Sequence, residues 1–213
     1  MKKYNRFYPA ASILGAFLLW TAAVRFIDVQ AIGPEGSSVG LATINRFFHS
    51  LTGVHMSLYT ITDWLGLVPV GFVFGFAGLG IVQWVKRKHL LHVDRSILVL
   101  GGFYFAVMGS YLLFETLIIN YRPVLIDGIL EASYPSSTTM LVLCVIPTAM
   151  MQLHARLKSK SLCRCIDVVL TVFLLFMVIG RLLSGVHWLT DIIGGILLST
   201  GLVTLYRSIS APE

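Results

Sequence analysis

The stretch that decides the fold is residues 180–195, GRLLSGVHWLTDIIGG, which joins two long apolar runs. It places a cation, Arg181, an imidazole, His187, and a carboxylate, Asp191, at the start of an otherwise apolar helix. Charged side chains that deep in a hydrophobic segment are unfavourable and usually functional. His187 and Asp191 are four residues apart and share one face of a helix, so Asp191 can hold one ring nitrogen of His187. The other nitrogen is then free to attack an electrophile, with Arg181 nearby to bind an anion, and the stretch predicts an active site.

The composition around this stretch is that of an integral membrane protein. Of the 213 residues, 56% are hydrophobic and only 12% are charged, whereas a soluble domain carries about 25% charged residues. The mean hydropathy is +0.83. Runs of the length needed to cross a ~30 Å hydrocarbon core occur at residues 7–27, 63–85, 96–119, 138–155, 165–182 and 188–206. Because backbone groups inside lipid must be hydrogen-bonded within their own segment, we predict an all-α, polytopic protein: a six-transmembrane-helix bundle that forms a single domain, residues 1–213.

The positively charged residues predict how this bundle is oriented. Most of the 16 Lys and Arg residues fall on one side of the spans, at Lys2, Lys3, Arg6, Lys86, Arg87, Lys88, Arg95, Arg156, Lys158, Lys160, Arg164 and Arg207. The positive-inside rule makes this side, with both termini, cytoplasmic, so we predict a multi-pass protein of the cell membrane. The first run is too long for a signal peptide, and Trp20 and Arg25 replace a small-residue cleavage site, so we expect a retained helix. The net charge of +6 needs no nucleic-acid partner, because topology and anionic membrane lipids explain it.

Three outer loops remain. The first, residues 28–56, carries apolar side chains at helical spacing, which predicts an amphipathic segment on the outer membrane surface or packed on the bundle. These side chains are Leu41, Ile44, Phe47, Phe48 and Leu51. The second loop, residues 120–138, contains Arg122-Pro123 and Pro135, which exclude a continuous helix. The third is short and lies around Gly185. Topology alone therefore brings the charged residues of the opening stretch and of the second loop to the extracytoplasmic end.

Three motifs in this order resemble those of the type-2 phosphatidic acid phosphatase superfamily of membrane lipid phosphatases. The family motifs are K-x6-R-P, P-S-G-H and S-R-x5-H-x3-D. The matching residues here are Glu115 and Arg122-Pro123, then Pro135-Ser136-Ser137-Thr138, then Gly180-Arg181, His187 and Asp191. The resemblance covers residues 56–206 and includes the six-helix plan and the motif order.

The resemblance implies roles for the matching residues. His187 would be the nucleophile that forms a phosphohistidine, and Asp191 would orient it. Arg122 and Arg181 would clamp the phosphoryl oxygens. Ser136 and the amides around Ser137 would add hydrogen bonds, as a helix N-terminus does for anions. This chemistry needs no metal and no other cofactor.

Two residues depart from the family pattern. Glu115 stands where the family has a phosphate-binding Lys, and Thr138 stands where it has a His that resembles a general acid. Thr does not titrate near neutral pH, and loss of a general acid or base costs about 10²–10⁴-fold in rate. His49 or His55 could supply the missing proton, or Glu115 could act as the acid if burial raises its pKa. Alternatively, the substrate has a leaving group that needs little protonation, as in a lipid diphosphate, or is a phosphodiester lipid whose headgroup is transferred to an alcohol.

Other carboxylates have simpler interpretations. We interpret Asp63 as an N-cap at the start of the second span. Asp127 and Glu131 are expected to be solvated loop carboxylates, with selection of a cationic headgroup such as choline or ethanolamine as the alternative.

The sequence thus predicts a hydrolase that acts through His187 on a phosphorylated or diphosphorylated lipid at the outer leaflet. Headgroup phosphotransfer and a catalytically impaired, lipid-binding member of the family stay open as alternatives. A lipid transporter is disfavoured, because few intramembrane charges extend toward the cytoplasmic side. The sequence does not fix the lipid or the oligomeric state.

Overall fold

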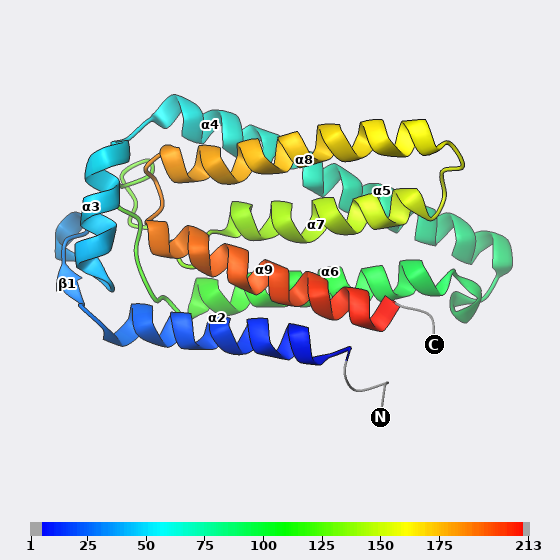
Figure 1. The fold of residues 1–213 in the computed structure, drawn as a ribbon, viewed down its shortest axis with the longest axis horizontal. Coiled ribbons are helices and arrows are strands. Elements are labelled where there is room, and N and C mark those ends of the chain that lie inside the picture. Colours follow the sequence, from blue (N-terminus) through cyan, green and yellow to red (C-terminus); the bar gives the residue numbers. More distant parts are fainter. Residues whose placement is uncertain (1–5, 211–213) are drawn as a thin grey trace.

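The apolar runs form six helices that are long and apolar enough to span a membrane, as predicted. The computed structural model describes residues 6–210, and residues 1–5 and 211–213, including Lys2 and Lys3 of the predicted cytoplasmic charges, lie outside the described part. The spans are α2 (Tyr8–Phe26), α4 (Met56–Leu65) with α5 (Leu67–Arg87), α6 (Arg95–Thr116), α7 (Ser137–His154), α8 (Lys160–Leu183) and α9 (Leu189–Ser210). They run along the long axis of the molecule (Figure 1).

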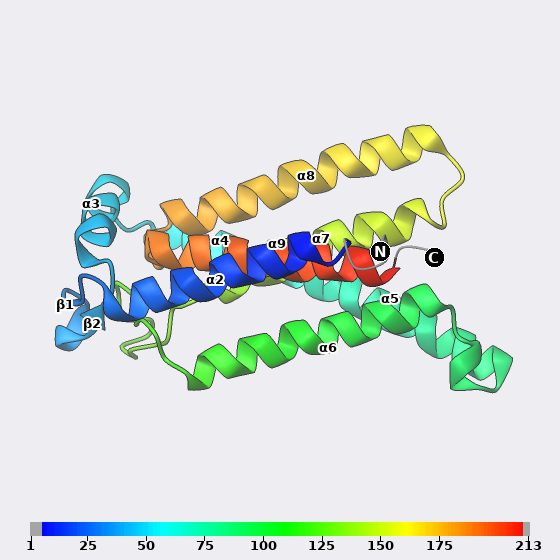
Figure 2. The same ribbon diagram turned by 60° about the horizontal axis from the view of Figure 1, so that its bottom comes forward.

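The centre of the bundle is made by α7 and α9. In the most apolar windows of these two helices 50% and 56% of the residues are buried, compared with 11–22% in the other spans. α9 packs against both α2 and α7, and α7 also packs against α8. Figure 2 shows α8 and α6 on opposite sides of this central pair. The outer helices expose large apolar side chains such as Leu19, Phe74 and Phe105, which is the surface expected of helices that face lipid.

The second span begins earlier than the sequence suggested. The predicted start was residue 63, but the helix begins at Met56, and α4 and α5 are separated only at Gly66, whose own φ and ψ are helical. Residues 56–62 contain no proline or glycine, so nothing in that segment ends a helix. Asp63 therefore lies in the last turn of α4, and its interpretation as an N-cap is wrong.

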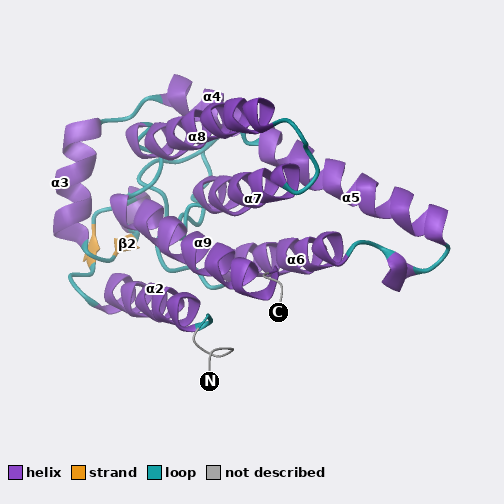
Figure 3. Ribbon diagram, turned by 45° about the vertical axis from the view of Figure 1, so that its right-hand side comes forward, coloured by secondary structure: helices purple, strands orange, loops and turns teal. Residues whose placement is uncertain are grey.

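One end of the bundle carries most of the irregular structure, and we call it the site end. It is formed by α3 (Ala42–Thr52), by residues 117–136 and by residues 184–188. It also carries a short hairpin of β1 (Gln30–Ala31) and β2 (Ser38–Val39), with the 3-10 turn η1 (Pro34–Gly36) between the two strands. Figure 3 shows α3 and these strands together at this end.

The predicted helix in the first outer loop is present as α3. Ile44, Phe47 and Leu51 are exposed on it, whereas Ala42 and Asn45 are buried. The opposite end of the bundle holds the start of α2, the end of α9 and the connections α5–α6, with its 3-10 turn η2 (Leu90–His92), and α7–α8 (Figure 1). That this opposite end faces the cytoplasm stays a prediction from the positive-inside rule.

Candidate active site

His187 lies at the site end in the turn between α8 and α9, two residues before α9 begins, so the prediction that it shares a helix with Asp191 is wrong, although the two side chains are adjacent. The Ser184 hydroxyl donates a 2.7 Å hydrogen bond to the carbonyl of Arg181, which closes the last turn of α8. Gly185 has a φ of +69°, and a Cβ at this position would overlap the carbonyl oxygen of Gly53. The turn therefore requires glycine, and it leaves the following His187 only 3% exposed.

Asp191 is held in place in the first turn of α9, where it is fully buried. Its Oδ2 accepts a 2.9 Å hydrogen bond from the backbone N–H of Trp188, the residue before α9, as the carboxylate of a capping box does. Its Oδ1 accepts a 3.5 Å hydrogen bond from Asn120 Nδ2. The Nδ1 atom of His187 lies 3.6 Å from Oδ2, just beyond hydrogen-bond distance. The carboxylate is thus fixed beside the ring that it is expected to orient.

The contact between Arg181 and His187 defines the tautomer of the imidazole. Arg181 Nη2 lies 3.2 Å from His187 Nε2. A guanidinium only donates hydrogen bonds, so Nε2 is the unprotonated acceptor and the ring proton is on Nδ1, facing Asp191. Burial, followed by the nearby charges of Arg181 and Arg122, holds the pKa of His187 well below its usual value. The site therefore presents a neutral imidazole with a free electron pair on Nε2.

Two buried arginines lie near this imidazole. Arg122 is 8% exposed and Arg181 is 1% exposed. Arg122 Nε lies 2.9 Å from Glu131 Oε2, but its N–H does not point along that line, and the pair is ionic without a hydrogen bond at Nε. Arg181 Nη1 lies 3.7 Å from Asp63 Oδ1. The Tyr59 ring lies under both guanidinium groups, with its centroid 4.9 Å from Arg181 Cζ and 5.9 Å from Arg122 Cζ.

These arginines keep unused donors. Among the described residues, Nε and Nη1 of both Arg122 and Arg181 have no hydrogen-bond partner, although all four atoms are buried. The hydroxyl of Ser136 is in the same condition. Buried polar groups are normally bonded, and leaving one unpaired costs about 1–3 kcal/mol or more when it is charged. A cluster of unpaired donors around a neutral imidazole is therefore suited to bind an anion with several oxygens.

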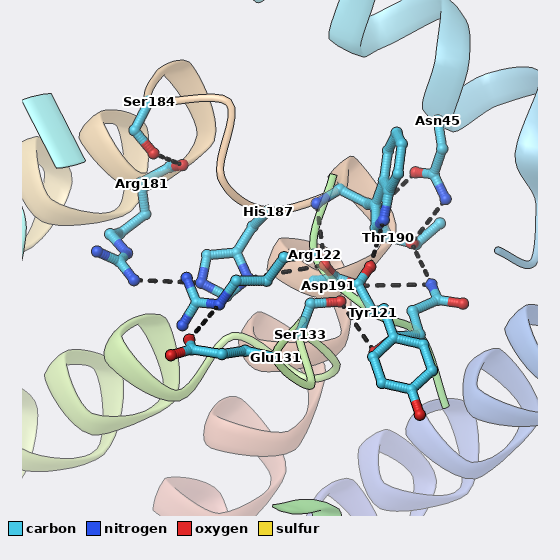
Figure 4. A network of polar contacts seen from close by, with 12 residues as sticks. Asn45, Tyr121, Arg122, Glu131, Ser133, Arg181, Ser184, His187, Thr190 and Asp191 are labelled. Carbon is cyan, nitrogen blue, oxygen red and sulfur yellow. Dashed lines mark hydrogen bonds and ion pairs between the residues drawn. The ribbon is translucent and has the colours of Figure 1, made fainter. Parts of the chain in front are cut away.

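A network of amides connects this cluster to the loops (Figure 4). Asn45 of α3 donates to the Thr190 hydroxyl over 3.0 Å and accepts from the Thr190 backbone N–H over 3.2 Å. Asn120 accepts from the backbone N–H of Gly40 over 3.0 Å while it donates to Asp191. Both asparagines are buried. The start of α9 is thereby joined to α3 and to the second loop.

A polar cavity of about 430 Å³ opens beside His187. Its lining includes Glu115, Tyr121, Arg122, Glu131, Ser137 and His187. A second cavity of about 340 Å³, which we call the apolar groove, lies between α5, α6 and α7 and includes Val70, Val107 and Leu141. The two cavities share Tyr111, Ser137 and Met140, so they adjoin at the start of α7. Among residues 6–210, no group of three or more His, Cys, Asp or Glu side chains is placed to hold a metal ion.

The structure brings together most of the residues singled out from the sequence. His187, Asp191, Arg122, Arg181 and the start of α7 lie within one region of the site end. Ser136 occupies the N-cap position of α7, but its side chain makes no capping hydrogen bond.

The two residues that depart from the family motifs are placed differently. Thr138 lines the apolar groove, not the polar cavity. Glu115 lines the polar cavity but is exposed, so the burial that its role as a general acid required is absent. Arg122 is ion-paired with Glu131 and not with Glu115.

The two candidate proton donors among the histidines face backbone carbonyls and do not line the polar cavity. His49 Nε2 contacts the carbonyl of Gly185 at 3.1 Å. His55 Nε2 contacts the carbonyl of Thr52 at 2.9 Å. Their positions support structural roles in the turns that surround the site.

Several residues of the site were missed or misjudged from the sequence. Tyr59 and Asp63 are four residues apart on α4, a spacing that shows they share a helix face but not which face turns inward. Asn45 and Asn120 carry only a weak signal, as amides inside loops that adjoin apolar runs. Glu131, expected to be a solvated loop carboxylate, is half-buried against Arg122.

Comparison with known proteins assigns the family. The model of the PAP2 superfamily matches residues 101–212, more than half of the chain, including all three motif regions. The chain therefore belongs to the PAP2 superfamily, and at the level of the family it is a multi-pass membrane phosphatase whose substrates are lipid phosphates.

The fold is also similar to a known structure of this class. The crystal structure of a transmembrane PAP2-type phosphatidylglycerolphosphate phosphatase from Bacillus subtilis aligns with a TM-score of 0.62 at 19% sequence identity. The alignment covers 95% of this chain and 96% of that one. No curated protein sequence matches the chain.

Proposed function

We propose that this protein transfers the phosphoryl group of a phosphorylated or diphosphorylated lipid to water through a covalent intermediate on His187. The observation that carries this proposal is the unprotonated Nε2 of a buried imidazole, flanked by two buried arginines with unpaired donors. Binding without catalysis would not need an oriented imidazole. Splitting one difficult transfer into two steps is the advantage of a nucleophile of this kind.

The proposed reaction begins when the phosphoryl oxygens take up the free donors of Arg122 and Arg181. Arg181 Nη2, which lies 3.2 Å from His187 Nε2, moves to a phosphoryl oxygen and frees the electron pair of Nε2. Nε2 forms a bond to phosphorus as the bond to the leaving oxygen breaks, while Asp191 stabilises the charge that develops on the ring. Water then attacks phosphorus and the N–P bond breaks, which returns His187 to its neutral form. The proton that this water loses passes to solvent, and solvent supplies the proton that the departed leaving oxygen takes up.

The apolar groove supports a lipid as the substrate. It adjoins the polar cavity and is lined mainly by aliphatic side chains and Met108. A third cavity of about 330 Å³ between α5 and α6 shares Val73, Tyr104 and Met108 with the groove. Together they form an apolar path from the site along the bundle, in which a hydrocarbon chain can lie while the phosphate stays at His187. On the orientation predicted from the positive charges, the site faces the extracytoplasmic side and takes its lipid from the outer leaflet.

The lack of a general acid at the position of Thr138 determines which leaving group is favoured. Neither Thr138 nor the exposed Glu115 is placed to protonate a leaving alkoxide, so we expect slow turnover of simple phosphomonoesters, by about 10²–10⁴-fold relative to an enzyme with a general acid. The turnover of a lipid diphosphate is slowed least, because its leaving group is a phosphate, which needs little protonation.

Headgroup phosphotransfer is the second candidate function. The observation that favours it is the presence of two carboxylates, Glu115 and Glu131, in the polar cavity. They disfavour a substrate with two or more phosphate charges.

The test is reconstitution of the purified protein with phospholipids, lipid phosphates and polyprenyl diphosphates. Phosphate release and headgroup exchange are measured for the wild type, for His187→Ala and for the control His92→Ala at the opposite end of the bundle. We expect activity in the wild type and the control, and none in His187→Ala. If all three proteins are equally inactive on every lipid, the protein is a lipid-binding member and the proposal is wrong. Exchange without phosphate release establishes the transferase.

A further inference from the structure

The polar cavity beside His187 is lined by more negative than positive charge. The charged residues in its lining are Arg122, Glu115 and Glu131, and His187 is neutral. Arg181, which contacts His187 but does not line the cavity, adds a second cation beside the imidazole. Near the rest of the lining, Glu115 and Glu131 repel a second negative charge on a phosphomonoester, because like charges at short distance disfavour each other. A headgroup with one negative and one positive charge meets no such penalty.

Glu131 is fixed in this position by the backbone of the second loop. The backbone N–H of Arg122 donates a 3.0 Å hydrogen bond to the Glu131 carbonyl, and Tyr121 pairs with Ala132 in the same way as residues of two antiparallel strands. This register sets the Glu131 carboxylate 2.9 Å from Arg122 Nε while 38% of its side chain stays exposed. One carboxylate is thus held between the phosphate-binding arginine and the open cavity.

Glu115 reaches the same cavity from a different element, the last turn of α6. It is exposed and has no ion-pair partner among residues 6–210. Neutralising the charge of Arg122 is therefore a sufficient role for the Glu131 carboxylate in this cavity. It does not account for the presence of the Glu115 carboxylate.

Aromatic rings complete the lining. Tyr111, Phe114, Tyr121 and Tyr134 line the cavity with the two carboxylates. Aromatic faces together with carboxylates are the surroundings that bind alkylammonium groups. The unpaired, buried Nη1 of Arg122 lies in the same cavity and marks the place of the anionic part of the ligand.

We propose that the polar cavity binds a zwitterionic headgroup, in which a phosphodiester is joined by a short linker to an alkylammonium group. The phosphodiester lies at Arg122 and His187, and the ammonium group lies between Glu115, Glu131 and the tyrosine rings. Asp127, the other acidic residue of this loop, does not line the cavity and takes no part. This assignment rests on the headgroup-transfer form of the proposed function, which takes a phosphodiester, and only in placing the phosphate at His187.

The test compares two ligands that differ in the headgroup alcohol, which is cationic in one and neutral in the other. Hexadecylphosphocholine and hexadecylphosphoglycerol have the same chain and the same singly charged phosphodiester. Their dissociation constants are measured by thermophoresis with the full chain in maltoside detergent. We expect the wild type to bind the choline ligand about tenfold more tightly, the preference that one desolvated ammonium–aromatic and carboxylate contact gives.

Variants identify the groups responsible. Glu115→Gln removes one charge from an exposed, unpaired side chain, and we expect it to lower the preference to about twofold or less. Glu115→Gln combined with Glu131→Gln should abolish the preference. Glu35→Gln, which removes the same charge from the exposed turn η1 at the same end, should leave the ratio unchanged.

Two results would overturn the assignment. One is a wild type that binds both ligands equally or prefers phosphoglycerol, and the other is a double variant that keeps the wild-type ratio or weakens both ligands equally. The proposed function would fail on a different measurement. In that case the wild type would show no turnover but would still bind the choline ligand more tightly.

Discussion

His187 is the residue on which the proposed reaction depends, and its surroundings keep it neutral. Its ring is buried, faces two guanidinium groups and receives a hydrogen bond on Nε2. All three features disfavour the imidazolium form. The residue is therefore prepared to act as a nucleophile under conditions in which an exposed histidine would be protonated.

This lowered pKa predicts the pH dependence of the rate. An exposed histidine titrates at about pH 6.5, and in the native protein His187 stays unprotonated below that value. We expect the acid limb of kcat/KM to lie below pH 6.5 for a phosphodiester substrate, whose own charge does not change there. A limb centred at the ordinary value for histidine would contradict the geometry.

The same shift links His187 to stability. Its folded pKa is lower than its unfolded pKa, so its protonation favours the unfolded chain. Its contribution is constant above about pH 6.5 and is lost as the pH falls from there toward the folded pKa.

Asp191 gives a second prediction at this scale. Asp191→Asn keeps the size of the side chain but removes the charge that stabilises the ring during attack. We expect kcat to fall by about 10²–10⁴-fold, with substrate binding nearly unchanged, because the phosphate contacts Arg122 and Arg181. Equal losses in kcat and in substrate affinity would show that Asp191 supports the fold of the site and not the imidazole.

At the scale of elements, the site depends on how α8, α9, α3 and the second loop meet. The turn around Gly185 is the tightest of these junctions, because its backbone lies against Gly53, the residue after α3. Asn45 and Asn120 then hold the start of α9 from two sides. The precision of the site comes from these contacts between elements, since α9 alone does not fix the position of His187.

Two glycines with similar backbone angles test this junction. Gly185 has a φ of +69° and Gly128 a φ of +78°, but a Cβ meets the Gly53 carbonyl only at position 185. We expect Gly128→Ala to lower the free energy of unfolding by about 1 kcal/mol, the cost of the left-handed conformation. Gly185→Ala should cost several times more and should abolish activity. Thermal unfolding in detergent measures both, and equal effects would show that the contact with Gly53 is not important.

At the scale of the whole molecule, the bundle separates a site end from an opposite end rich in Lys and Arg. The charge distribution predicts that the opposite end is cytoplasmic. This orientation decides from which leaflet a lipid reaches His187.

Cysteine labelling tests the orientation. Cys165 is exposed at the start of α8, at the opposite end, and Cys144 is buried. We expect a membrane-impermeant maleimide to label Cys165 only after the cells are lysed. In a variant that lacks all three native cysteines, Glu35→Cys at the site end should be labelled in intact cells. The reverse pattern would place the site in the cytoplasm.

The sequence predicted the helices well because lipid imposes a simple rule. Each span must satisfy its own backbone and present apolar side chains over about 20 residues, so hydropathy locates it. The error at the second span has a physical cause, since Asp63 was taken as the start of a helix that continues through it. The motif residues on α8 and α9 were also visible, because charges are rare inside apolar runs.

The sequence by itself determined the class of protein, the number of spans, the likeness to PAP2 proteins and the nearness of His187 to Asp191, since these depend on composition and on local spacing. The structure places His187 in the turn before α9 and not on the helix with Asp191. Only the tertiary structure decided that Glu131 and not Glu115 pairs with Arg122, that Tyr59 and Asp63 face the arginines, and that Thr138 lines the apolar groove. These facts depend on which faces of different elements meet. That is set by packing between segments far apart in the chain, which local spacing does not specify.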